Sequence, residues 1–160
     1  MTMRVGMGYD VHQLQQGRPL ILGGVNVPWE QGLAGHSDAD VLLHAIMDAL
    51  LGAGALGDIG MHFPPGEPRF ANISSLLLLK RVGELLQKSG FGVLNIDSTI
   101  VAQRPRLAPH ILKMRQNIAR TLDLSVEVVS VKATTTEHLG FAGREEGIGA
   151  YAVTLISKSG

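Results

Sequence analysis

The sequence predicts one compact domain in which β-strands and α-helices are mixed. The chain has 160 residues, of which 45% are hydrophobic and only 4% aromatic, so its core should consist of Leu, Val, Ile and Ala. A chain of this length buries roughly 70% of the surface that its unfolded form exposes, which suffices for a single core. Stretches of alternating apolar residues, typical of strands, occur between stretches with apolar residues at helical spacing. No segment repeats and none has the composition of a linker, so we expect residues 1–160 to form a single domain.

The N-terminal part of the chain is expected to be extended. Apolar residues alternate with glycine and polar residues from Arg4 to His12, which predicts a strand with one apolar and one polar face. Leu20 to Val27 is a second extended segment, in which Gly23-Gly24 favours a turn and which Pro28 ends.

Three helices are predicted from apolar residues that recur at helical spacing. The first begins at Ser37 or Asp38, either of which could cap it, and ends near Ala55. A proline-rich surface loop should follow it. We expect this loop and the other two helices at Asp58–Ala71, Ser74–Lys88 and Pro105–Leu122, respectively.

Three further strands complete the expected set, at Val93–Ala102, Val128–Ala133 and Gly149–Ile156. The last two are joined by the polar segment Thr134–Gly147, which is too long for a hairpin turn. Loops of that length are commonly functional.

Composition excludes several classes of function. The chain has no cysteine, which excludes a disulfide scaffold, a thiolate zinc site, an iron–sulfur cluster and a cysteine nucleophile. With 14 basic and 14 acidic residues and no basic run, it lacks the excess or cluster of positive charge that attracts nucleic acid. The longest apolar run, Leu76–Leu79, is too short to span a membrane. We therefore expect a cytoplasmic protein with neither nucleic acid nor membrane as a partner.

Two segments suggest a metal site. Asp10 and His12 lie two residues apart on the first predicted strand, so their side chains emerge on the same face. On the first predicted helix, polar residues at intervals of four form one stripe that could supply a third ligand. Three ligands of mixed nitrogen and oxygen type with one open position are what catalytic zinc needs. The same residues would also occur on an exposed strand and on a solvent-facing side of a helix that bind no metal. The residues of the stripe are His36, Asp40, His44 and Asp48.

Other segments suit phosphate groups. Gly32–Asp40 brings two glycines, a serine and a histidine to a helix start, where backbone amides favour an anion, although Ser37 could be an ordinary cap. Lys132–Glu137 combines a cation, three hydroxyls and a carboxylate, which suits phosphate oxygens with magnesium. The same residues would also occur at the end of a threonine-rich strand that binds no phosphate. Gly57–Gly60 is either a ligand-binding turn or a plain one.

Five blocks occur in order and cover essentially the whole chain. They are Gly8–His12, Leu22–Val25, His36–Ala45, Ala55–Gly60, and Lys132–Glu137 with Gly140-Phe141. Together these blocks resemble the 2-C-methyl-D-erythritol 2,4-cyclodiphosphate synthase family. Where many members carry Asp-x-Asp-Pro, this chain has Pro65–Pro68, and Ala71-Asn72 replaces the usual Lys-Gly.

The resemblance implies a phosphorus–oxygen lyase of non-mevalonate isoprenoid biosynthesis. Such an enzyme converts 4-diphosphocytidyl-2-C-methyl-D-erythritol 2-phosphate to the cyclic diphosphate and CMP, through attack of the 2-phosphate on the β-phosphorus. The resemblance also implies an α+β fold, a single-domain two-layer sandwich with a four-stranded mixed sheet and helices on one face. Family members form homotrimers with active sites between subunits. The rival functions are a zinc-dependent phosphohydrolase and a non-catalytic trimer that binds a diphosphate.

The resemblance also implies roles for individual residues. Asp10, His12 and His44 match the zinc ligands, and the first two also match substrate contacts. Glu137 matches the site of a second divalent cation, magnesium or manganese. The expected transition-state stabilisers are His36 and Thr135, and a neighbouring substrate contact is Ser37.

The remaining expected substrate contacts form three groups. The methylerythritol part is expected at Asp58, Ile59, Gly60, Phe63, Pro64, Pro65, Gly66 and Glu67. The cytidine diphosphate part is expected at Ala102, Gln103, Arg104, Pro105, Arg106, Leu107, Ala108, Thr134, Thr135, Thr136 and Glu137. Two further substrate-side positions are Phe141 and Arg144.

Overall fold

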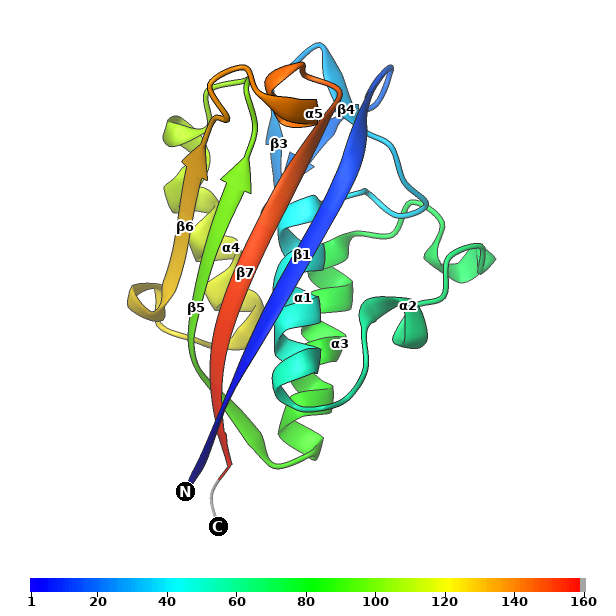
Figure 1. Ribbon diagram of the computed structural model, residues 1–160. Helices are drawn as coiled ribbons and strands as arrows, with labels where there is room; N and C mark the ends of the chain where they lie inside the picture. The colour runs from blue at the N-terminus through cyan, green and yellow to red at the C-terminus, as the bar shows by residue number, and fades with distance from the viewer. Residues whose placement is uncertain (159–160) are drawn as a thin grey trace.

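A mixed β-sheet, covered by helices on one face, organises the structure, a computed structural model that describes residues 1–158 (Figure 1). The strand order is β4-β1-β7-β5-β6; β5 and β6 are parallel and the other neighbours are antiparallel. The strands are β1 Thr2–Gln16, β4 Gln31–Leu33, β5 Phe91–Val101, β6 Val129–Thr134 and β7 Gly147–Lys158. The α+β class and the mixed sheet are confirmed. The sheet has five strands rather than four, because Gln31–Leu33 pairs with the end of β1.

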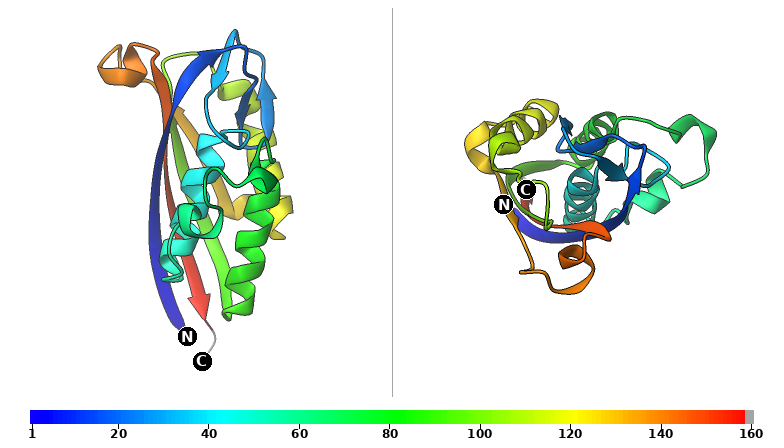
Figure 2. Two further views of the ribbon diagram at one scale, coloured as in Figure 1. Left: turned by 90° about the vertical axis from the view of Figure 1, so that its right-hand side faces the viewer. Right: turned by 90° about the horizontal axis from the view of Figure 1, so that it is seen from above.

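The helices α1, α3 and α4 lie on the same side of this sheet, as the edge-on view in Figure 2 shows. They span Val41–Ala53, Ser75–Lys88 and Ile111–Leu122. Two short strands, β2 Leu20–Leu22 and β3 Val25–Val27, form a separate hairpin that turns at the predicted Gly23-Gly24 pair. Within residues 1–158, no helix combines the length and the apolar character that crossing a membrane requires.

Helix α1 is the centre of the core. Eleven of its 13 residues are buried, because the sheet covers one side and α3 covers another. The approach to β1 is very close: a Cβ atom on Gly8 would lie 1.9 Å from the carbonyl oxygen of Ala45, and one on Gly6 would meet Ala49 at the same distance. Glycine on the inner face of β1 is therefore what lets α1 pack directly against it.

Several expected helix boundaries are wrong. Helix α1 begins after Asp40, whose carboxylate accepts a hydrogen bond from Leu43 N; neither Ser37 nor Asp38 caps it. The third predicted helix starts at Ile111 rather than Pro105, because Pro109 lacks an amide hydrogen and disfavours helix in the residue before it. The expected loop Asp58–Ala71 contains helix α2, Ile59–His62, and a 3-10 turn at Pro68–Phe70. Further short pieces are 3-10 turns at Ala108–His110 and Val126–Val128, and helix α5, Gly140–Gly143.

The opposite face of the sheet is apolar, and of the helices within residues 1–158 only the short α5 lies beside it (Figure 2). Side chains from β1 and β7 on this face are between 36% and 69% exposed. The rings of Tyr9 and Tyr151, which are register partners, lie 4.7 Å apart. We call this surface the outer sheet face, defined by Met3, Val5, Met7, Tyr9, Val11, Tyr151 and Val153.

Candidate metal centre and active site

Asp10, His12 and His44 converge on one point. The first two project from the inner face of β1, and His44 comes from the first turn of α1. Asp10 Oδ2 lies 2.9 Å from His12 Nε2 and 3.1 Å from His44 Nδ1, and the two ring nitrogens are 3.1 Å apart. The close packing of α1 on Gly8 is what brings His44 within reach of the strand.

The donor atoms of this triad fit a cation. His12 Nδ1 lies 2.8 Å from the carbonyl oxygen of Ala34, which can only accept, so Nδ1 carries the proton. In a neutral ring, Nε2 then points a lone pair at the carboxylate of Asp10. His44 Nδ1 is equally close to both groups, so a positive charge among these three atoms, a proton or a metal ion, would stabilise the arrangement. A carboxylate and two imidazoles form a typical zinc ligand set with room for a fourth, open position.

The protonation state of Asp10 suits metal binding, whereas His12 would have to release any proton on Nε2 to bind a metal. Burial raises the pKa of Asp10, but hydrogen bonds and charge interactions with His12 and His44 outweigh this and hold the pKa below its usual range. Burial lowers the pKa of His12, and the carboxylate of Asp10 reverses that effect and raises it. Asp10 therefore stays ionised at neutral pH, as a metal ligand must.

The triad lies in a pocket of about 240 Å³. Of the expected substrate contacts, the structure brings His36, Ser37, Ile59, Gly60, Phe63 and Pro65 to this pocket. Three apolar lining residues were not predicted, because their helical spacing or aromatic character marks only core: Met47, Phe70 and Leu78.

The predicted polar stripe on the first helix does not exist as one surface. Only His44 joins the triad. Asp40 is fully buried and turned towards the β2–β3 hairpin, where it accepts hydrogen bonds from Gly23 N and Gly24 N at 3.0 and 2.8 Å. His36 precedes the helix, and Asp48 accepts a hydrogen bond from Ile59 N at 2.9 Å, which fixes the start of α2.

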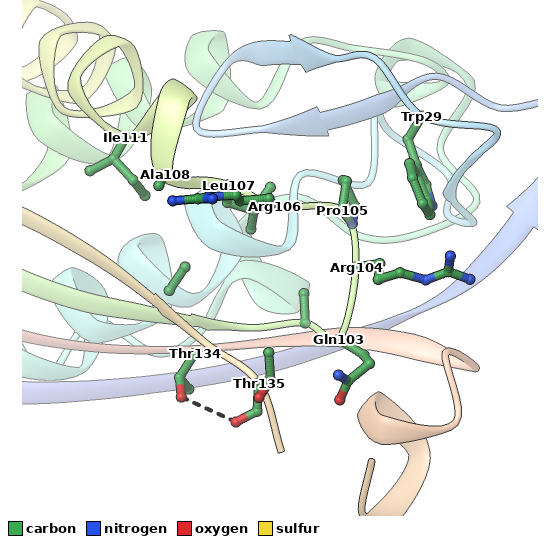
Figure 3. Close-up of a pocket in the computed structure, with 12 residues that line it drawn as sticks. Trp29, Gln103, Arg104, Pro105, Arg106, Leu107, Ala108, Ile111, Thr134 and Thr135 are labelled. Atoms are coloured by element: carbon green, nitrogen blue, oxygen red, sulfur yellow. Dashed lines mark hydrogen bonds between the residues drawn. The ribbon is translucent and has the colours of Figure 1, made fainter. Parts of the chain in front are cut away.

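A second and larger pocket, of about 610 Å³, is lined by the segment between β5 and α4 (Figure 3). Every expected cytidine-site residue from Ala102 to Ala108 lines it, as do Thr134 and Thr135 at the end of β6. Ala133, which belongs to the predicted phosphate segment Lys132–Glu137, also lines it, as do Trp29 and Ile111, which were not predicted. Trp29 comes from the segment after β3, and the Arg104 guanidinium lies 5.3 Å from its ring centre.

Hydrogen bonds tie the loop after β6 to this pocket. The backbone N–H of His138 donates to Gln103 Oε1 at 3.0 Å, and that of Glu137 donates to Thr135 Oγ1 at 3.3 Å. Glu137 and His138 both have left-handed backbones, with φ of 52° and 64°. Such conformations are costly for side chains other than glycine, and they persist only where the surroundings hold them. Thr136 and Glu137 do not themselves line the pocket.

Other expected contacts lie apart from both pockets. Asp58 caps α2 by accepting from Met61 N at 2.9 Å, and Glu67 meets His36 only through its carbonyl oxygen, at 2.8 Å from Nε2. Arg144 pairs with Glu146 at 2.7 Å. Neither pocket is lined by Asp58, Pro64, Gly66, Glu67, Arg144 or Phe141, the last of which lies beside Tyr9 and Tyr151 on the outer sheet face.

The two pockets share no lining residue within the described part of the chain. The metal triad and His36 lie in the smaller one, and Thr135 lies in the larger one. A ligand that touched both groups on one chain would have to cross the surface between the two pockets.

Comparison with known proteins identifies the family. The profile of the YgbB family matches residues 3–157. A relative from Syntrophomonas wolfei, named 2-C-methyl-D-erythritol 2,4-cyclodiphosphate synthase, is 68% identical over 157 residues, which cover 98% of this chain and all of the relative.

Solved structures agree with this assignment. The bifunctional IspDF of Campylobacter jejuni superposes with a TM-score of 0.95 at 43% identity, over 99% of this chain and 43% of that longer chain. IspF of Plasmodium falciparum, solved as a complex with CDP, superposes with a TM-score of 0.86 at 30% identity, over 99% of this chain and 97% of that one. From its sequence and its fold, the chain belongs to the YgbB family.

Proposed function

We propose that the whole chain, residues 1–160, is one 2-C-methyl-D-erythritol 2,4-cyclodiphosphate synthase domain. Relatives of that name match it over nearly their full length. The observation that carries the proposal is the triad of Asp10, His12 and His44, whose donor atoms converge in the wall of a pocket and could hold a metal ion. The proposed substrate is 4-diphosphocytidyl-2-C-methyl-D-erythritol 2-phosphate.

The proposed reaction is an intramolecular phosphoryl transfer. An oxygen of the 2-phosphate attacks the β-phosphorus, the bond from that phosphorus to the oxygen of the α-phosphate breaks, and CMP leaves. No side chain acts as a nucleophile. When bound, zinc at the triad and magnesium or manganese at Glu137 would neutralise charge on the phosphates.

The chain's own residues would bind and orient the substrate. The pocket lined by Ala102–Ala108 and Trp29 is proposed to hold the cytidine part, and the pocket beside the triad the methylerythritol part. His36 and Thr135 are proposed to donate hydrogen bonds to phosphate oxygens as negative charge moves towards the leaving group. Holding both reacting phosphates in line supplies several kcal/mol, because the entropy of bringing them together is lost on binding.

We also propose that the active form is a homotrimer with its active sites between subunits. Two observations support this. The outer sheet face exposes a row of apolar side chains, which marks an interaction surface. The two pockets also share no lining residue, so the larger pocket of one copy would complete the smaller pocket of its neighbour.

Phosphorus NMR of the purified protein with the proposed substrate tests this function. We expect the substrate signals to be replaced by those of CMP and a cyclic diphosphate once zinc and magnesium are supplied. Substrate that stays unchanged with both metals present would contradict the proposal.

A further inference from the structure

We propose that Asp38 and Ser75 are positioning residues that hold His44 in the protonation form and orientation in which Nδ1 binds the metal. Neither residue belongs to the triad or lines either pocket. The inference rests on the proposed metal centre. It assigns a role to a buried polar chain that runs from the start of α3 to the back of His44.

Ser75 is the central link of this chain. It is the first residue of α3 and has no exposed surface. Its backbone N–H donates to Asp38 Oδ2 at 2.9 Å, and its Oγ lies 2.5 Å from Asp38 Oδ1. Because a carboxylate can only accept, the single hydroxyl proton of Ser75 lies towards Asp38.

The direction of that bond fixes the next one. Ser75 Oγ also lies 3.0 Å from His44 Nε2, and its proton is already committed to Asp38, so Oγ must accept here and Nε2 must donate. A neutral ring with its proton on Nε2 has a lone pair on Nδ1. Nδ1 is the atom that lies 3.1 Å from both Asp10 Oδ2 and His12 Nε2.

Asp38 is itself held in place. Besides the two bonds from Ser75, Oδ1 accepts from the backbone N–H of Asp40 at 3.1 Å. The carboxylate therefore fixes Ser75, and Ser75 orients the ring of His44. Partners of this kind, on the far side of a metal-bound imidazole, raise its basicity and typically contribute 10–100-fold to metal affinity.

A second, weaker acceptor limits the expected effect. Ser37 Oγ lies 3.3 Å from His44 Nε2, and the backbone N–H of Ala39 donates to that same oxygen at 3.2 Å. If Ser75 loses its hydroxyl, Nε2 still has Ser37 as a partner. We therefore expect the lower end of the range, a loss of about tenfold in zinc affinity.

The test measures zinc affinity directly, by competition with a chromophoric chelator. Ser75→Ala should bind zinc about tenfold more weakly than the wild type, and Ser75→Thr, which keeps a hydroxyl, should recover most of the loss. The matched control is Ser98→Ala, which removes a buried hydroxyl that donates to the Ser130 carbonyl on β6. The control should lose stability without losing zinc affinity.

Asp38 is tested through its dependence on Ser75. Asp38→Asn should weaken zinc binding when Ser75 is present, because the two bonds from Ser75 go to different oxygens of Asp38 and only one terminal atom of an amide can accept. In the Ser75→Ala background, Asp38→Asn should weaken zinc binding little further, because the effects of residues that act through one another are not additive. Additive losses would mean that Asp38 does not act through Ser75.

A spectroscopic readout separates positioning from mere folding. Zinc-loaded wild type and Ser98→Ala should each show a downfield, slowly exchanging His44 Nε2–H proton resonance, which should move upfield and broaden in Ser75→Ala. Equal zinc affinity in Ser75→Ala and the wild type, with that resonance unchanged, would overturn the inference. A wild type that binds no zinc would instead overturn the proposed metal centre.

Discussion

The side chain of Glu137 differs from the triad of Asp10, His12 and His44 in exposure and in neighbours. It lies on a loop held by Gln103 and Thr135, away from the buried end of α1. A single exposed carboxylate that completes its cation site with substrate phosphate suits magnesium or manganese better than zinc. The two proposed cations should therefore respond to different substitutions.

Glu137→Gln tests this separation. We expect the variant to need much more magnesium or manganese for the same turnover, because the amide removes the negative charge, while zinc stays bound. The measurement is turnover against added magnesium, together with zinc content by elemental analysis. Loss of both metals at once would argue for one shared site.

Asp40 makes the stability of the fold depend on pH. Burial and the charge of Asp38 raise the pKa of Asp40 from 3.8 to about 6, against hydrogen bonds from three backbone amides that lower it. Well below pH 3.8 the carboxyl is neutral in both the folded and the unfolded chain. As pH rises from about 4 to about 6, the unfolded chain loses this proton before the folded one does, so the contribution to stability is lost across that range and changes little above it.

The comparison with Asp40→Asn isolates this effect. The free energy of unfolding of the wild type, relative to that of Asp40→Asn, should fall between about pH 4 and pH 7, because the amide does not titrate. Urea unfolding at several pH values measures it. A constant difference across that range would mean that Asp40 has an ordinary pKa in the folded protein.

At the scale of secondary structure, the contact between β1 and α1 is the feature on which the site depends. Gly8→Ala would place a Cβ atom 1.9 Å from the Ala45 carbonyl oxygen, which is backbone and cannot rotate away. We expect α1 to shift outwards, with a loss of about 3 kcal/mol in stability, at the upper end for overpacking. Zinc affinity should fall as well, because His44 moves with the helix.

A matched control lies on the same helix. Gly52→Ala adds a Cβ atom that meets nothing within 4 Å, and alanine is favoured over glycine inside a helix by about 0.5–1 kcal/mol. Thermal unfolding and zinc titration should show a stabilised Gly52→Ala with normal affinity. A Gly8→Ala protein that binds zinc normally would contradict the role of this contact.

Elements with a clear periodicity could be predicted from the sequence. The alternation in Arg4–His12 and the helical spacing in Ser74–Lys88 each correspond to an element of the right type. The start of α1 could not be predicted, because Ser37, Asp38 and Asp40 are all good caps and only tertiary contacts choose between them. Asp38 bonds to α3 instead, a partner 37 positions away in the chain.

The candidate site was predictable to a similar extent. A strand with period two places Asp10 and His12 on one face, which sequence spacing captures. Which residue of the helix joins them depends on the packing of α1 on glycine. Trp29 was missed, because nothing local links the segment after β3 to the pocket before α4.

At the scale of the whole molecule, the outer sheet face predicts association. Sedimentation should find a trimer without added substrate. Met7→Asp, which puts a charge on this face, should give monomers with little turnover. Leu77→Asp, at a similarly exposed position on α3, should remain a trimer. A wild-type monomer with full turnover would contradict active sites that two subunits share.

The central claim is that the substrate's own phosphate, rather than water, attacks the β-phosphorus. The same open metal site could activate water in a phosphohydrolase, so the source of the oxygen decides between the two. Turnover in heavy-oxygen water, followed by mass spectrometry, should give unlabelled CMP and an unlabelled cyclic product that is lighter by one water than the open bisphosphate. Heavy oxygen in either product, or an open bisphosphate as the main species from the first turnovers, would contradict the account.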